Sequence, residues 1–272
     1  MMKVGEVFLP DDQDFKHFKN ECTSDDGWTV CYDKSACRVA TKKNTLSAFD
    51  VVRVQSEFND ISAELLYDVL HDSEYRSTWD TAMLEGSDIC TVQPNSDIGY
   101  YSIKSPPPFK NRDFVTQRCW LDFGRNKEKY IINHSVNHLS HPPKKNFVRG
   151  ISYLTGFLMV PKNEKSCTFY YMTQCDPGGS LPAWVVNKTS KVLVPKLMKK
   201  LMKACGKYEK WKGKHQPQYK PWLYPEQMTA PRINYADIGT FSAEETLIAS
   251  GDTNEGAIGE NAVEIDKFVG DE

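Results

Sequence analysis

The sequence has no apolar run long enough to cross a lipid bilayer. Its longest apolar stretch, residues 151–160, is ten residues long and is interrupted by Ser152, Thr155 and Gly156, whereas a membrane-spanning helix needs about 20. The first residues lack the apolar segment of a secretory signal, and neither a Met-Gly start nor a C-terminal cysteine box for lipidation is present. We therefore expect a cytoplasmic protein whose contact with membranes is peripheral and transient.

Motifs of the common enzyme and metal-site classes are also missing. The chain contains no nucleophile elbow, P-loop, dinucleotide-binding glycine motif or His-Glu-x-x-His sequence. Its eight cysteines include no Cys-x-x-Cys pair, so we interpret them as reduced, small apolar residues. The histidines at positions 134, 138 and 141 lack a neighbouring cysteine or carboxylate, and no metal is expected there. These absences favour a protein that is not an enzyme and has no cofactor.

Charge is divided unevenly along the chain. The formal net charge is −2, but residues 236–272 hold ten acidic residues and one lysine, and the rest of the chain carries an excess of seven positive charges. Because this last segment has few large apolar groups, we expect an acidic disordered tail over residues 236–272. The preceding residues, 213–235, are rich in proline and aromatic residues and are expected to form a surface extension. Ser242 precedes Ala-Glu-Glu, a pattern of acid-directed kinases, and a phosphate there would weaken membrane engagement.

The periodicity of apolar residues predicts a β-rich domain over residues 11–212, after an N-terminal segment at residues 1–10. The order is one helix, three strands, two helices, six strands and a long last helix, with short turns that favour antiparallel hairpins. We predict an α+β fold in which a curved antiparallel sheet of about nine strands grips the last helix. The expected strands cover residues 27–33, 36–42, 49–58, 87–92, 98–104, 113–123, 129–138, 147–160 and 167–175.

The last helix, residues 183–212, is amphipathic and basic. Its apolar residues from Val194 to Cys205 repeat at spacings of three and four. Residues 181–215 contain ten lysines and a single acid, and each lysine near an anionic leaflet can add about 1 kcal/mol of binding. Pro195 removes a backbone hydrogen bond and is expected to kink the helix. We expect a lid that docks on an anionic membrane surface and opens there, formed by Trp184, Lys188, Lys191, Pro195, Lys199 and Lys203.

Arg76 and Asp80 are four residues apart on a short expected helix, and therefore lie on one face of it. An exposed pair of this kind would add only about 0.3–0.5 kcal/mol, and arginine before aspartate is the less favourable order. The other interpretation is a pair that faces inward, in which the aspartate holds Arg76 while its remaining donors bind a phosphate. The tyrosines of the nearby strands suit ordinary sheet packing or an aromatic box for a quaternary ammonium.

Three motifs, in this order, resemble the START domain family (steroidogenic-acute-regulatory-related lipid transfer). They are Tyr75-Arg76 with Trp79-Asp80, then Asn111-Arg112-Asp113, and finally the run Asp176-Pro177-Gly178-Gly179-Ser180-Leu181-Pro182 before Trp184. The resemblance spans about residues 11–212 and is strongest to the phosphatidylcholine-transfer subgroup, in particular to a carrier of phosphatidylcholine and phosphatidylethanolamine. It implies a helix-grip fold with a tunnel between sheet and last helix, which holds one phospholipid as cargo.

The resemblance also implies which residues meet the lipid head group. Arg76 and Asp80 match the pair that contacts the phosphate and head group, while Tyr101, Phe114 and Tyr153 match the aromatic cage around choline. This chain has no tryptophan in the cage, and tyrosine and phenylalanine bind cations less strongly than tryptophan does. A softer cage is expected to accept ethanolamine alongside choline.

The sequence thus predicts a monomeric, cytosolic phospholipid-transfer protein that shuttles phosphatidylcholine or phosphatidylethanolamine between membranes. The expected partners are a phospholipid, an anionic membrane surface and an acid-directed kinase, and no nucleic acid. Two alternatives stay open. One is a lipid sensor or adaptor that binds a partner through residues 216–235, and the other is an acyl-ester hydrolase with a nucleophile and a base in the same cavity.

Overall fold

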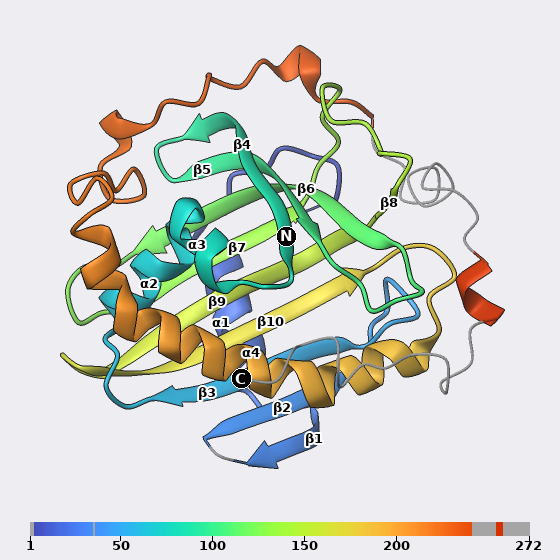
Figure 1. Ribbon diagram of the computed structural model, residues 1–272, viewed down its shortest axis with the longest axis horizontal. Helices are drawn as coiled ribbons and strands as arrows, with labels where there is room; N and C mark the ends of the chain where they lie inside the picture. The colour runs from blue at the N-terminus through green and yellow to red at the C-terminus, as the bar shows by residue number, and fades with distance from the viewer. Residues whose placement is uncertain (1–2, 35, 241–253, 258–272) are drawn as a thin grey trace.

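The computed structural model describes residues 3–34, 36–240 and 254–257, and gives the backbone alone at residues 183, 184 and 186–193 (Figure 1). The described helices are α1 (Asp12–Thr23), α2 (Ala63–His71), α3 (Ser73–Trp79) and α4 (Ala183–Lys212), with short 3₁₀ turns η1 (Pro225–Gln227), η2 (Tyr235–Asp237) and η3 (Asn254–Ala257). The described strands are β1 (Thr29–Lys34), β2 (Cys37–Lys42), β3 (Val51–Phe58), β4 (Met83–Gln93), β5 (Ser96–Ile103), β6 (Asn111–Asp122), β7 (Lys129–Ser135), β8 (Phe147–Arg149), β9 (Ile151–Asn163) and β10 (Ser166–Asp176).

The strands form one sheet in the order β1-β2-β3-β10-β9-β7-β6-β5-β4, and every neighbouring pair in this order is antiparallel. The predicted α+β fold is confirmed, with one short strand more than expected: β8 pairs with β6 in parallel. The strand expected at residues 147–160 is in fact β8 and β9, separated by Gly150. A Cβ atom at Gly150 would lie 2.3 Å from the ring of Phe114, so this close approach requires glycine.

Helices cover both faces of the sheet (Figure 1). On one face, α4 packs Met198 and Leu201 into a core cluster with Phe169 of β10. On the other face, α1 packs Phe15 and Phe18 against strands β6, β7, β9 and β10. The helix α1 begins at a capping box formed by Asp11 and Asp14, which satisfies N–H groups that the first helical turn leaves free.

The helix α3 is shorter than the sequence pattern predicts. The sequence pattern predicts a helix over residues 73–83, but α3 ends at Trp79 and β4 already begins at Met83. The side chain of Asp80 accepts hydrogen bonds from the backbone N–H groups of Ala82 and Met83. This local side-chain bond offers the backbone an alternative to another helical turn.

Residues that follow α4 lie against the folded domain. Trp222 is buried and donates a hydrogen bond to Asp68 at 2.7 Å, while Lys220 bonds the other oxygen of the same carboxylate. Arg232 and Ile238 form single β-bridges with the domain. Within the acidic segment expected to be disordered, residues 236–240 and η3 are placed by the structure, and Ser242 lies outside the described residues. None of the helices described here is long and apolar enough to cross a membrane.

Candidate functional site

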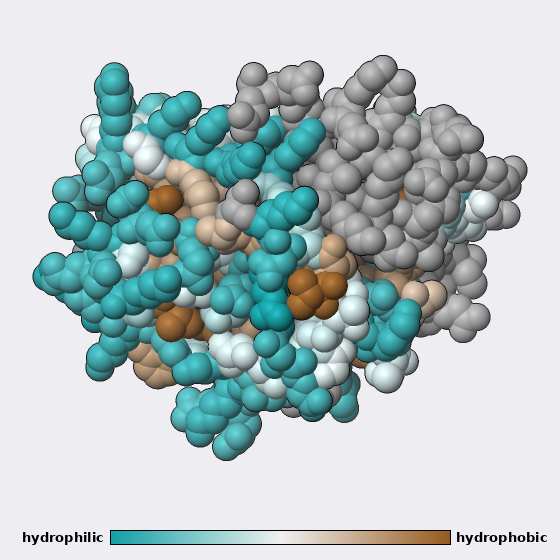
Figure 2. Space-filling view, turned by 90° about the horizontal axis from the view of Figure 1, so that it is seen from below, coloured by the Kyte–Doolittle hydropathy of each residue, from teal (hydrophilic) through white to brown (hydrophobic). Residues whose placement is uncertain are grey.

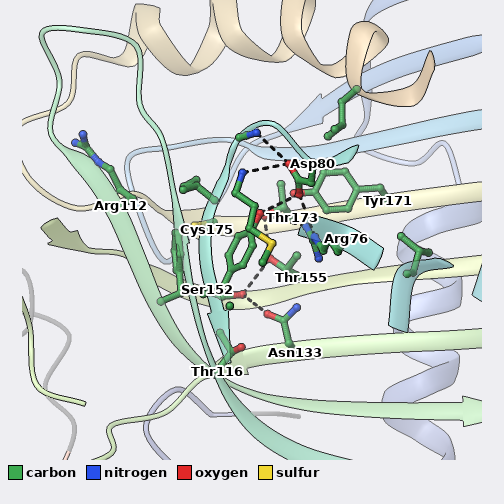
Figure 3. Close-up of a pocket in the computed structure, with 18 of the residues that line it drawn as sticks. Arg76, Asp80, Arg112, Thr116, Asn133, Ser152, Thr155, Tyr171, Thr173 and Cys175 are labelled. Atoms are coloured by element: carbon green, nitrogen blue, oxygen red, sulfur yellow. Dashed lines mark hydrogen bonds and ion pairs between the residues drawn. The ribbon is translucent and has the colours of Figure 1, made fainter. Parts of the chain in front are cut away.

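A cavity of about 590 Å³ lies between the inner face of the sheet and α4 (Figure 3). Its apolar wall includes Phe157 and Phe169 from the sheet, and Val194, Leu197, Met198 and Leu201 from α4. The polar residues that line it come from α2, α3 and α4, from strands β4, β5, β6, β7, β9 and β10, and from the loops between them. A mostly apolar cavity with a few placed polar groups is the usual form of a site for an organic ligand.

Arg76, Asp80 and Tyr101 form a closed hydrogen-bonded group in this cavity. The Nε atom of Arg76 lies 3.0 Å from Oδ2 of Asp80, and its Nη2 donates to the Tyr101 hydroxyl at 3.2 Å. That hydroxyl donates in turn to Oδ2 of Asp80 at 3.2 Å. The Arg76 guanidinium also lies over the Tyr101 ring, 4.8 Å from its centre. Arginine carries five N–H donors, so the described bonds leave three of them available to a ligand.

Burial and charge set the protonation states of this group. Burial raises the pKa of Tyr101, and the nearby Asp80 carboxylate adds to that shift, against the effect of Arg76. Burial works against the charge of Arg76, but Tyr101 and Asp80 outweigh it, so the pKa of the guanidinium lies above its ordinary value. Near neutral pH the group therefore holds a protonated tyrosine and a charged arginine, which is the state that binds a phosphate.

Phe114 lines the same cavity from β6, directly opposite Tyr101 of β5 in the strand register. Tyr153, the third residue expected in the cage, is not among the residues that line it. The register between β9 and β10 shifts at this point: Gln174 pairs with Leu154 and Cys175 pairs with Ser152, so Tyr153 is passed over. The shift places Ser152 in the cavity wall, while Thr155, opposite Thr173, faces the cavity on the same side of β9 as Phe157.

A row of polar residues on the sheet was not identified from the sequence. Oγ1 of Thr155 lies 2.8 Å from Oγ1 of Thr173, and the Ser152 hydroxyl is 3.0 Å from Thr155 and 3.1 Å from Oδ1 of Asn133. Tyr171, near Arg76, lies on the same strand as Thr173, and burial raises its pKa to about 12. In the sequence, these residues are visible only as polar residues at alternate positions 171, 173 and 175. Alternating polar residues are usually assigned to the solvent-facing side of a strand, so the pattern does not indicate a cavity.

Two observations on the described part of the chain concern metal binding and nucleophilic chemistry. Among the described residues, no group of three or more His, Cys, Asp or Glu side chains is arranged to hold a metal ion. Cys175 lines the cavity, but burial raises its pKa to about 12, and a protonated thiol is a poor nucleophile.

The predicted lid residues are only partly described. Pro195 lies within α4, which is helical on both sides of it, and Lys199 and Lys203 are exposed. The side chains of Trp184, Lys188 and Lys191 lie outside the described part. Not every lysine of this helix faces solvent: Lys212 is buried, because its ammonium bonds the Asp72 carboxylate at 2.8 Å.

The fold and the cavity define an intracavity ligand-binding protein of helix-grip architecture. The START domain family matches residues 12–211 of this chain. The chain belongs to the START domain family.

Relatives of known name agree with this assignment. START domain-containing protein 10 of Mus musculus is 45% identical over 239 residues, which cover 88% of this chain and 81% of the relative. Phosphatidylcholine transfer protein of Bos taurus is 32% identical over 180 residues, covering 65% of this chain and 81% of the relative. The crystal structure of human STARD10 superposes with a TM-score of 0.82 at 44% identity, covering 88% of this chain and 97% of that one. The last match confirms the helix-grip START fold.

Proposed function

We propose that this protein binds one glycerophospholipid in its cavity and carries it between membranes. The observation that supports this most is a largely apolar cavity that also contains Arg76. Asp80 is the one carboxylate among the described hydrogen-bond partners of Arg76, and the remaining N–H donors of the guanidinium can bind a phosphate. The acyl chains would lie along Phe157, Phe169 and the apolar stripe of α4. Because the cavity replaces the bilayer as apolar surroundings, transfer between membranes is nearly balanced in free energy.

Arg76 is the proposed phosphate ligand. Asp80 and Tyr101 hold its guanidinium by Nε and Nη2, which restricts the side chain before the lipid arrives. A preorganised guanidinium can make two parallel hydrogen bonds to a phosphate, and such charge-assisted bonds are the strongest of their kind.

The head group beyond the phosphate is proposed to be choline or ethanolamine. Phe114 presents a ring to a quaternary ammonium, whereas one face of Tyr101 already carries Arg76. The hydroxyls of Ser152, Thr155 and Thr173 can accept N–H bonds from a primary ammonium, which choline cannot donate. The loss of Tyr153 from the cage and the gain of these hydroxyls both support acceptance of ethanolamine.

Exchange of the lipid is proposed to take place at an anionic membrane surface, through α4. Lys199, Lys203, Lys207 and Lys210 are exposed on the described part of this helix, and each adds attraction to an anionic leaflet. The face of the molecule in Figure 2 is largely hydrophilic, with small separate hydrophobic areas in its described part. The lysines of α4 support electrostatic docking of a cytoplasmic protein rather than deep insertion, and Pro195 is the proposed point where α4 bends.

Two measurements test this function. Lipids extracted from the purified protein should be phosphatidylcholine and phosphatidylethanolamine by mass spectrometry, and the protein should move labelled phospholipid between vesicles. Recovery of a sterol, a ceramide or a free fatty acid as the main ligand would overturn the proposal. Binding of phospholipid without transfer would instead support the sensor alternative.

A further inference from the structure

Glu255 of η3 and Arg112 of β6 form a buried ion pair at one end of the cavity. Oε2 of Glu255 lies 2.6 Å from Nη2 of Arg112, and Oε1 lies 3.2 Å from Nη1. The side chains are 5% and 3% exposed. Arg112 lines the cavity, and in Figure 3 it lies apart from the Arg76–Asp80 pair.

The donors of Arg112 define a site for one anion. Its guanidinium donates to three backbone carbonyls, those of Lys110, Pro177 and Gly178. Since arginine has five N–H donors, two remain, one on each Nη atom, and both reach the Glu255 carboxylate. The backbone N–H of Lys110 adds a third bond to the same carboxylate at 2.8 Å. Two parallel guanidinium donors are the arrangement that matches a carboxylate or a phosphate.

This anion site joins the two segments that border one end of the cavity. Lys110 belongs to the loop between β5 and β6, and Pro177 and Gly178 belong to the turn that leads into α4. Pro106, Phe109 and Pro177 from these segments line the cavity. The next residue of η3, Gly256, packs near Ser180, whose carbonyl would lie 3.4 Å from a Cβ atom at that position. Glu255 thereby fastens η3 across the end at which α4 begins.

Arg112 has no other carboxylate among its described hydrogen-bond partners. The neighbouring Asp113 is already engaged by Arg149, with bonds of 2.9 and 3.1 Å. A buried arginine that loses its counter-charge is strongly disfavoured, so departure of Glu255 requires another anion or access of water to this end of the cavity.

We propose that Arg112 and the Lys110 amide form an anion-binding site that Glu255 occupies in the free protein and that the head group of an anionic lipid takes over at the membrane. The exchange releases η3 from the α4 end of the cavity and opens it. The inference rests on the proposed carrier function, but the contact between Glu255 and Arg112 can be tested without measuring lipid transfer.

The test compares E255Q with wild type and with E260Q, which makes the same charge change at a position outside the described residues. Hydrogen exchange of the peptide that contains η3 is measured without vesicles, with phosphatidylcholine vesicles, and with vesicles containing about one third phosphatidylserine. We expect faster exchange in E255Q than in wild type and E260Q without vesicles. Anionic vesicles should raise the exchange of wild type and E260Q to the level of E255Q, whereas neutral vesicles should not.

Transfer rates provide the second measurement. E255Q should move phosphatidylcholine severalfold faster than wild type between neutral vesicles, and the difference should shrink on anionic vesicles, where wild type opens as well. Equal hydrogen exchange in E255Q and wild type, or a wild-type exchange rate that anionic vesicles leave unchanged, would overturn the inference. If no variant transfers lipid, the carrier function fails, and the hydrogen exchange still decides whether Glu255 occupies an anion site.

Discussion

Asp72 binds the ammonium of Lys212 at 2.8 Å, and both side chains are buried. The same Asp72 caps α3 through the N–H of Tyr75 and accepts a bond from the hydroxyl of Tyr208. These contacts attach the C-terminal end of α4 to α2 and α3. The Arg112–Glu255 pair borders the other end of α4, where the helix begins, so release of that pair is expected to open the cavity there.

The Asp72–Lys212 pair predicts a large loss of stability in K212M. Removal of the ammonium leaves a buried carboxylate without its counter-charge, which typically costs about 3–5 kcal/mol in the free energy of unfolding. Urea denaturation measures this, and K210M serves as the control because Lys210 is exposed. The double variant D72N/K212M should be less destabilised than the sum of the two single variants. Equal stability of K212M and K210M would contradict the role of this pair.

Arg76 is expected to dominate lipid affinity. R76Q removes the charge that binds the phosphate, and charge-assisted hydrogen bonds contribute about 1.5–3 kcal/mol, so affinity should fall about 10- to 100-fold. R76K should retain part of it. The measurement is transfer of labelled phosphatidylcholine between vesicles. R125Q is the matched control, since Arg125 is 81% exposed. Full transfer activity of a normally folded R76Q would show that Arg76 does not bind the phosphate.

The hydroxyls of Thr155 and Thr173 are expected to favour ethanolamine. The double variant T155V/T173V keeps side-chain size and removes acceptors for a primary ammonium. The ratio of phosphatidylethanolamine to phosphatidylcholine bound should fall by about two- to tenfold. Mass spectrometry of lipids bound from an equimolar mixture gives this ratio. T168V is the control because Thr168 bonds Glu57 and does not line the cavity. An unchanged ratio would show that the hydroxyls of Thr155 and Thr173 do not determine the head-group preference.

The exposed lysines of α4 are expected to set the dependence on membrane charge. Replacing Lys199, Lys203, Lys207 and Lys210 by glutamate should slow transfer from anionic vesicles by about tenfold or more, given about 1 kcal/mol for each lysine near the surface. Neutral vesicles provide the internal control, since the charges have no anionic partner there. A variant that is equally slow on both kinds of vesicle would indicate a folding defect rather than lost docking.

His71 predicts a loss of stability in mild acid. It is buried between Tyr67 and the stacked ring of Trp222, and burial, with a smaller contribution from Arg118, holds its pKa well below the ordinary value. Below about pH 6.5 the unfolded chain binds a proton at this histidine that the folded chain does not bind. Stability should therefore fall with decreasing pH, by up to about 1.4 kcal/mol per unit from this group.

The measurement for His71 is the free energy of unfolding between pH 7 and pH 5. H71Q removes the titrating group, so its stability should depend less steeply on pH than that of wild type, whatever its stability at neutral pH. H17Q is the control because His17 is exposed. Equal slopes for H71Q and wild type would show that other groups carry the acid sensitivity.

Local pattern accounts for much of what could be predicted. The helix-grip order of elements follows from apolar periodicity, and the capping residues Asp11 and Ser62 lie where the helices begin. The Arg76–Asp80 pair is visible as two charged residues on one helical face. The cavity positions of Tyr101 and Phe114 follow from the family motifs.

The structure departs from the expected pattern where one residue changes the strand register. The shift between β9 and β10 passes over Tyr153 and brings Ser152 into the cavity wall, because a single-residue shift exchanges the two faces of a strand. The break at Gly150 has a similar origin, since only the fold brings the ring of Phe114 against that position. Neither signal is present in the local sequence.

By itself, the sequence determined the class of fold, the basic amphipathic last helix and the charge contrast between the body and the acidic tail, because each depends on local order or on composition. Tertiary structure alone decided which lysine is buried, which polar residues face the cavity and which carboxylate meets Arg112. These depend on contacts between residues far apart in the chain: Asp72 and Lys212 are 140 residues apart, and Arg112 and Glu255 are 143 apart. Because both pairs are buried, loss of one partner leaves a charge without a counter-charge away from water, which strongly destabilises the folded state.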